Sequence, residues 1–258
     1  MSEIPATPRP QGDALVPVVG AATDVGRLRS VNEDGYLALP PAFVVVDGMG
    51  GHAAGRAATR AALGALASLS GTAVTDEQVI TRAMLAAGEA VTAIPSHAAH
   101  RPGATVAGVV LARPTKDAAT WIVFNIGDSR VYLLRDGALT QMSRDHSQVQ
   151  ALIDAGQLTP DQARHDPRKN VVTRALGAGL NQEAVPDMFT ASAQRGDRLL
   201  VCSDGLTDEL DDEALVTVLG AGMRPQRTAE AAVAAALEAG GHDNATALVV
   251  DLVPESAL

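Results

Sequence analysis

The apolar residues of this chain follow two spacings, which predict where strands and helices lie. Residues 43–46, Phe-Val-Val-Val, form a continuous apolar run of the kind found in strands buried on both faces. In residues 53–70 and 79–91, apolar side chains instead recur every three to four positions, which is typical of helices with one buried face. The second of these helices is expected to begin at Thr75, because Thr75 and Gln78 have capping-box spacing.

The second half of the chain is rich in short apolar runs that predict strands. Four of them follow residue 103, at 105–111, 120–126, 131–135 and 138–142. Strands joined by such short connections must be antiparallel, and Asp136-Gly137 between the last two is a strong hairpin signal. Further strands are expected at 16–22, 36–39, 197–201 and 245–253, and further helices at 211–219 and 225–239. Because the strands are not interleaved with helices one by one, the pattern indicates an α+β fold.

Residues 143–178 interrupt this pattern with a polar, irregular stretch. Short helices are expected there near 148–155 and from Thr159-Pro160, where Thr would cap and Pro would occupy the first turn. Such an insertion is a candidate flap or recognition segment. Residues 1–15 carry several prolines and neither a basic start nor an apolar run, so they predict a disordered tail rather than a signal peptide. Residues 16–254 are expected to form one domain.

Composition narrows the class of protein. The 258 residues are 47% hydrophobic, enough for a sizeable core, and carry a net charge of −10. This charge argues against nucleic acid and anionic membranes as partners, and no apolar run approaches the ~20 residues that span a bilayer. The single cysteine, Cys202, lies in an apolar run and is expected in the core. Without a disulfide framework, the sequence favours a reducing, cytoplasmic location.

Acidic residues stand at the boundaries of four apolar runs. These boundaries are Asp47-Gly48, Gly127-Asp128, Asp204-Gly205 and Asp243-Asn244. If the four acids meet at one end of a β core, their mutual repulsion is costly without cations. Oxygen ligands without a Cys/His cluster favour Mg²⁺ or Mn²⁺ over zinc, and two such ions can activate water and neutralise a phosphate. The arrangement therefore suggests phosphoester hydrolysis, the alternative being four unrelated surface turns.

Five motifs occur in an order that resembles one enzyme family. They are Arg29-Ser30-Val31-Asn32-Glu33-Asp34, Asp47-Gly48-Met49-Gly50-Gly51-His52, Gly127-Asp128-Ser129-Arg130, Cys202-Ser203-Asp204-Gly205-Leu206-Thr207-Asp208 and Asp243-Asn244. Together they look like the motifs of bacterial metal-dependent serine/threonine protein phosphatases, the PPM or type-2C family, over about residues 16–253. The resemblance implies an α-β-β-α sandwich of two antiparallel sheets flanked by helices.

The same resemblance implies roles for individual residues. By similarity, Asp47 bridges two Mn²⁺ or Mg²⁺ ions, the Gly48 carbonyl contributes to one of them, and Glu33 acts through bound water. The resemblance also implies that Asp204 and Asp243 complete the coordination of the other ion. It further implies that Asp128 and Asp204 form a third, weaker metal position. Arg29 matches the arginine that binds the substrate phosphate, where its planar fork suits two oxygens. The plainer alternative for Arg29 is a solvated loop arginine.

The implied mechanism is direct attack of a metal-bridging hydroxide on phosphorus, without a covalent phosphoenzyme. Consistently, no Cys-x5-Arg phosphate loop follows Cys202. His52 is a candidate general acid because it follows the metal-bearing turn, and a structural role at the helix start is its alternative. One departure from bacterial relatives is Arg101-Pro102-Gly103-Ala104-Thr105, where they often read Gly-Met-Gly-Thr-Thr; a structural effect is expected.

These observations predict a phosphatase acting on phosphoserine and phosphothreonine in proteins. Its expected partners are phosphoproteins and a bacterial Ser/Thr kinase that it opposes, and it is expected to be a monomer. Three alternatives stay open: a phosphatase dedicated to one regulatory protein, a non-catalytic phosphoprotein-binding module, and a phosphodiesterase or small-molecule phosphatase.

Overall fold

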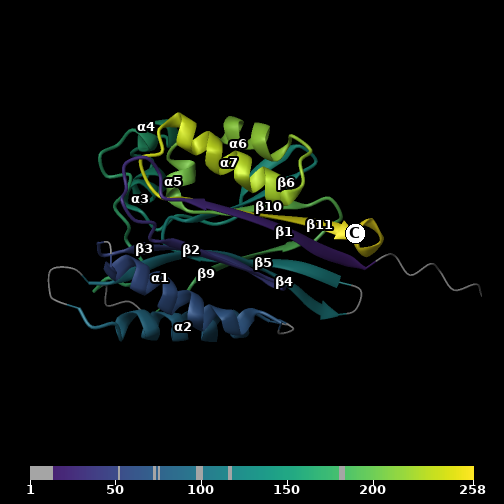
Figure 1. Ribbon diagram of the computed structural model, residues 1–258, viewed down its shortest axis with the longest axis horizontal. Coiled ribbons are helices and arrows are strands. Elements are labelled where there is room, and N and C mark those ends of the chain that lie inside the picture. Colours follow the sequence, from purple (N-terminus) through teal and green to yellow (C-terminus); the bar gives the residue numbers. More distant parts are fainter. Residues whose placement is uncertain are drawn as a thin grey trace, which may run out of the picture.

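Two antiparallel sheets packed face to face form the centre of the molecule (Figure 1). The computed structural model describes residues 14–51, 53–71, 74, 76–96, 101–115, 118–179 and 184–258. The first sheet has the strand order β1 (Leu15–Asp24), β11 (Ala245–Pro254), β10 (Arg198–Cys202), β6 (Arg130–Arg135), β7 (Ala138–Gln141). The second has the order β2 (Asp34–Leu39), β3 (Ala42–Met49), β4 (Gly103–Thr115), β5 (Ala118–Ile126), β9 (Asp187–Ser192), and β8 (Leu176–Gly177) pairs with β4.

Helices cover the outer face of each sheet, which confirms the predicted α-β-β-α sandwich (Figure 1). The second sheet is covered by α1 (Ala53–Leu66), which continues as the 3-10 turn η1 (Ala67–Leu69), and by α2 (Glu77–Thr92). The first sheet is covered by α5 (Asp204–Thr207), α6 (Asp212–Leu219) and α7 (Pro225–Ala239). Two short helices, α3 (Gln148–Asp154) and α4 (Pro160–Arg164), lie within residues 143–178, and the 3-10 turn η2 (Glu255–Ala257) follows β11.

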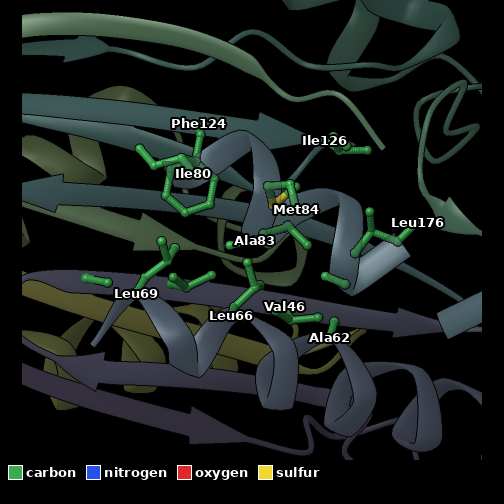
Figure 2. Packing of buried hydrophobic residues seen from close by; sticks show 14 of the residues in the cluster. Val46, Ala62, Leu66, Leu69, Ile80, Ala83, Met84, Phe124, Ile126 and Leu176 are labelled. Carbon is green, nitrogen blue, oxygen red and sulfur yellow. The ribbon is translucent and has the colours of Figure 1, made fainter. Parts of the chain in front are cut away.

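The alternation of side chains along β3 divides the core. Phe43 and Val45 point into the layer between the two sheets, whereas Val44 and Val46 pack toward α1 and α2. Figure 2 shows the outer layer, where Val46 and Leu66 lie near Met84. Residues 43–46 of β3 are all fully buried, which confirms the predicted strand with two buried faces. In the described part of the chain, no helix is both long and apolar enough to cross a membrane.

Element boundaries differ from the sequence-based expectation in several places. Helix α2 begins at Glu77 with Asp76 as its N-cap, whose side chain accepts hydrogen bonds from the Gln78 and Val79 amides; Thr75 lies outside the described residues. Strand β1 begins at Leu15, inside the segment predicted as a tail, and residues 1–13 lie outside the described part. Strands β8 and β9 and helix α5 were not predicted.

The strand register brings the acid-bearing ends of both sheets to the same edge of the sandwich. Asp34 at the start of β2 lies opposite Asp47 near the end of β3. In the other sheet, Cys202 at the end of β10 pairs with Ala247 near the start of β11, so the residues after β10 and before β11 are neighbours. The sheets meet here, since Ser203 Oγ and Thr246 Oγ1 each donate a 2.7 Å hydrogen bond to Asp34 Oδ2.

Candidate functional site

Five aspartates converge at this edge, and their mutual influence shows in the Asp47 carboxyl. Burial raises the pKa of Asp47 well above its ordinary value, and four neighbouring carboxylates raise it further, in the order Asp34, Asp204, Asp128 and Asp243. Asp34 lies in β2, Asp204 is the first residue of α5, and Asp128 and Asp243 lie in the loops that precede β6 and β11. The four strand-boundary acids are therefore one cluster, not unrelated turns, and a fifth acid, Asp34, belongs to it.

The other members of the cluster are equally short of compensating charge. Burial also raises the pKa of Asp204 well above its usual range, with Asp128 as the largest charged contributor. Burial and the charge of Asp145 raise the pKa of Asp128 to about 7. Burial raises the pKa of Asp34 to about 6, although hydrogen bonds from Thr246 and Ser203 oppose the shift. Such a group of buried carboxyls needs protons or cations to be stable.

Arg29 is in direct contact with the cluster. Its Nη2 donates to Asp243 Oδ2 at 2.5 Å, and the side chain stays half exposed. The loop that carries Arg29 is held by its neighbours: the Arg27 amide donates to Gly241 O at 2.7 Å. The Asn244 side chain makes three hydrogen bonds to this loop, accepting from the Glu33 amide and donating to the carbonyls of Val25 and Val31.

Glu33 and Gly48 lie together against the first turns of α1. Thr59 Oγ1 donates to Glu33 O at 2.6 Å, and the Gly48 amide donates to the same carbonyl at 3.3 Å. A Cβ on Gly55 would overlap Glu33 Oε1 and lie 2.8 Å from Gly48 O. A side chain at Gly48 would in turn overlap Gly55 O. Glycine at both positions therefore lets a carboxylate oxygen and a carbonyl oxygen approach the same place beside the acid cluster.

The oxygens gathered here fit a hard divalent cation, since carboxylates and a carbonyl are the ligands that Mg²⁺ and Mn²⁺ prefer. No three Asp, Glu, His or Cys side chains of the described residues form a closed metal-binding group as they stand. One of the carboxylates, Asp243, forms an ion pair with Arg29. The donor set fits the predicted metals by its chemistry.

Seven of the eight predicted site residues are described, and the structure brings them to this edge: Arg29, Glu33, Asp47, Gly48, Asp128, Asp204 and Asp243. His52 lies outside the described residues. Sequence reasoning missed Asp34 as a member of the cluster, Asn244 as the clamp of the Arg29 loop, and Gly55 as the site of close approach. The signal for Asp34 was its place beside Glu33 in the first motif.

The base of the 143–178 segment is fixed directly behind Asp128. The Gly127 amide donates to His146 Nδ1 at 3.0 Å, and the His146 amide donates back to Gly127 O at 2.8 Å. The other ring nitrogen, Nε2, lies 2.8 Å from Arg174 Nη1 and 3.2 Å from Asp187 Oδ2. Arg130, two residues after Asp128, forms a bidentate ion pair with Asp145.

A second connection joins the far part of this segment to Asp208, at the C-terminal end of α5, the one-turn helix that Asp204 opens. Lys169 Nζ lies 2.7 Å from Asp208 Oδ2, and the Asp208 amide donates to Asp204 O at 2.7 Å. The segment thus contacts the acid cluster from the side of Asp128 and from the side of Asp204. A segment held in this way can contribute to a substrate surface next to the acids.

The sequence pattern of the family described as Protein phosphatase 2C matches residues 30–239. This match covers most of the chain, including six of the eight predicted site residues up to Asp204. The chain belongs to the protein phosphatase 2C family. The PPM or type-2C resemblance drawn from the five motifs is thereby confirmed.

Named relatives from three bacterial genera agree with this membership. Serine/threonine protein phosphatase PstP of Mycobacterium tuberculosis is 36% identical over 244 residues, which are 93% of this chain and 46% of PstP. Serine/threonine phosphatase stp of Listeria monocytogenes is 32% identical, covering 89% of this chain and 93% of stp. Protein phosphatase PhpP of Streptococcus pneumoniae is 34% identical, covering 93% of this chain and 99% of PhpP. The chain spans about half the length of the PstP sequences that it matches.

Solved structures give the same answer for the fold. The catalytic domain of PstP in complex with two manganese ions superposes with a TM-score of 0.82 at 34% identity, over 93% of this chain and all of that domain. The phosphatase MsPP of Mycobacterium smegmatis, in complex with cacodylate, gives a TM-score of 0.80 at 34% identity, over 91% of this chain and 97% of that chain. The layered fold of this chain is thus that of PPM phosphatases.

Proposed function

We propose that this chain is a Mn²⁺- or Mg²⁺-dependent phosphatase that hydrolyses phosphoserine and phosphothreonine in proteins. The observation that carries the proposal is the convergence of Asp47, Asp128, Asp204 and Asp243 at one edge of the sandwich. Such a charge cluster is destabilising unless cations occupy it. The names of the relatives supply the substrate class, since PstP and stp are serine/threonine phosphatases.

The proposed metal ligands are the predicted ones. Asp47 would contact two ions, with the Gly48 carbonyl at one, Asp204 and Asp243 at the other, and Glu33 acting through water. Asp128 with Asp204 would hold a third, weaker ion. The PstP domain, which superposes over nearly the whole chain, was crystallised with two manganese ions. When bound, such ions supply an activated water and neutralise charge on the phosphoryl group.

The chain's own residues then bind and orient the substrate. Arg29, half exposed beside Asp243, can reach a phosphate with its planar fork. Asp34 is fixed by Ser203 and Thr246, so it holds a constant orientation beside Asp47. His52, which lies outside the described residues, is proposed as the proton donor to the leaving alkoxide.

A covalent phosphocysteine route is disfavoured by the burial of the only cysteine. Cys202 is fully buried in β10, and burial raises the pKa of its thiol to about 12. A thiol in this state is neither ionised at neutral pH nor accessible to a phosphoprotein. We therefore propose direct attack of water on phosphorus, without a phosphoenzyme.

Domain organisation, partners and location complete the proposal. Residues 16–254 would form one catalytic domain in which 143–178 is the flap that selects substrates, because this segment contacts the loop that carries Asp128 and the end of α5, which Asp204 opens. The protein would act on phosphoproteins as a cytoplasmic monomer and oppose a Ser/Thr kinase. The net charge of −10 gives nucleic acid and anionic membranes no electrostatic reason to bind.

The test is release of phosphate from a phosphothreonine peptide by the purified chain in EDTA, Mg²⁺ or Mn²⁺, with Asp47→Asn alongside. The proposal predicts turnover only with metal and a loss of at least about 100-fold in Asp47→Asn. Nucleotides and a phosphodiester serve as competing substrates. Turnover of these in place of the phosphopeptide would reassign the enzyme to small molecules, and no turnover by folded protein would favour a binding module.

A further inference from the structure

Both oxygens of the Asp243 carboxylate accept hydrogen bonds from groups of the chain itself. Oδ1 accepts a hydrogen bond of 2.8 Å from the Asn244 amide, and Oδ2 accepts one of 2.5 Å from Arg29 Nη2. The first bond is local and holds the carboxylate in orientation. The second joins residues that are 214 positions apart and places a full positive charge on a proposed metal ligand.

The surroundings of Arg29 are those of a cation site. Asp243 is in direct contact with the Arg29 guanidinium, and the charges of Glu33 and Asp204 also act on it. Asp204 and Asp243 are the side chains proposed at one of the two metal positions, and Glu33 is proposed to act through water. The guanidinium therefore lies beside the carboxylates that are proposed to bind the second ion.

We propose that Arg29 is a built-in competitor of the divalent cation, which neutralises Asp243 in the metal-free chain and must leave this carboxylate before metal is held there. The inference rests on the metal site of the proposed function. It assigns Arg29 a second role beyond phosphate binding, and the two roles exclude each other at Asp243. Metal uptake then frees the guanidinium, so that metal binding and oxyanion binding favour one another.

The structure allows this exchange without moving the backbone. The loop around Arg29 is fixed by the Arg27–Gly241 hydrogen bond and by the three bonds of the Asn244 side chain. The side chain itself is 52% exposed, so rotation about its own bonds can carry the guanidinium from Asp243 into solvent. Exchange by side-chain rotation alone leaves Asp243 and Glu33 in place for the metal.

The test is the affinity for Mn²⁺, measured by titration calorimetry on the wild-type chain, Arg29→Gln, Arg29→Lys and the control Arg27→Gln. Arg27 is exposed, lies on the same loop and forms no ion pair in the described part of the chain, so its variant removes the same charge without removing the contact. Arg29→Gln is expected to bind Mn²⁺ tighter by about threefold or more, and Arg27→Gln by less than about twofold. Arg29→Lys keeps the positive charge but not the planar guanidinium, so its Mn²⁺ affinity is expected to lie between those of the other two variants.

A second readout separates competition from general damage. In EDTA, the melting temperature of Arg29→Gln should fall below that of Arg27→Gln, because the acid cluster has lost its internal cation; in saturating Mn²⁺ the two should melt alike. Equal or weaker Mn²⁺ binding by Arg29→Gln, or the same gain in Arg27→Gln, would overturn the inference. Mn²⁺ binding that follows the predicted order in a chain without phosphatase turnover would uphold the competition while removing the proposed activity.

Discussion

At the scale of single residues, the site depends on side chains that hold the acids as well as on the acids themselves. Asn244 is the clearest case, since its amide oxygen and nitrogen together satisfy three backbone groups of the loop between β1 and β2. The loop carries Arg29 at its exposed side and Glu33 at its buried end. One side chain thus fixes the phosphate-binding candidate relative to the metal-binding candidates.

Replacing Asn244 with alanine is expected to lower the free energy of unfolding by about 1–3 kcal/mol, because buried backbone groups lose their partners. The same change should raise the KM for a phosphopeptide, since the loop is no longer held. Urea denaturation and steady-state kinetics measure the two effects. Gln78→Ala, which removes an exposed amide on α2, is the matched control. Equal stability of the two variants would contradict the clamp.

At the scale of elements, the 143–178 flap is fixed to the sheets by a charged pair at its base. Arg130 Nε and Nη2 donate to Asp145 Oδ2 at 2.9 and 2.6 Å, and Gln141 Nε2 donates to Asp145 Oδ1 at 3.0 Å. Asp145 is buried, and the Arg130 guanidinium is only about one-quarter exposed, at 27%. These contacts therefore hold the start of the 143–178 segment in place beside Asp128.

Asp145→Ala is expected to destabilise the chain by about 2–3 kcal/mol, toward the lower end for buried pairs because Arg130 keeps some access to water. Amide hydrogen exchange should become faster across 143–178. Asp161→Ala provides the control, since it removes an exposed acid of the same segment for which the described residues show no ion pair. If both variants unfold at the same urea concentration, the Arg130–Asp145 pair does not anchor the 143–178 segment.

Sequence patterns predicted the elements that have long or strongly apolar signals and missed the weak ones. The run at 43–46 indicated a strand buried on both faces, and the acids at the boundaries of such runs were found because strands end at sheet edges. Asp34 opens a strand of intermediate burial inside a polar stretch, so its partnership with Asp47 depends on register that the pattern does not contain. Strand β9, Asp-Met-Phe-Thr-Ala-Ser, is short and partly exposed, and α5 has only one turn.

The same limit applies to the contacts of the site. The predicted metal ligands follow from motif order, but the Arg29–Asp243 pair joins opposite ends of the chain, and no local pattern indicates it. The close approach of Gly55 to Glu33 likewise depends on how α1 packs. Residues whose role depends on long-range packing are found only once the fold is known.

At the scale of the whole molecule, the sandwich gathers negative charge from two sheets into one buried edge of an acidic protein. Folding therefore raises the pKa of Asp47, Asp204, Asp128 and Asp34, chiefly through burial. Above the ordinary carboxyl pKa of about 4, the unfolded chain has released protons that the folded chain still holds. The metal-free fold then becomes less stable as the pH rises.

We accordingly expect the melting temperature in EDTA to fall between pH 5 and pH 8, a range that includes the raised values of about 6 for Asp34 and about 7 for Asp128. Saturating Mn²⁺ should remove most of this fall, since the cations replace the protons. Differential scanning fluorimetry over the pH series, with and without metal, measures both. A metal-free melting temperature that stays level or rises with pH would show that the acids are not forced together.

The central claim is that one buried acid cluster holds the divalent ions. Counting the Mn²⁺ bound per chain by equilibrium dialysis tests it most directly, on the wild type, Asp47→Asn and Asp212→Asn, an exposed acid of α6 that serves as the control. The account predicts about two ions for the wild type and Asp212→Asn, and a loss of at least one in Asp47→Asn. A wild-type chain that binds none, or an Asp47→Asn chain that keeps both, would contradict it.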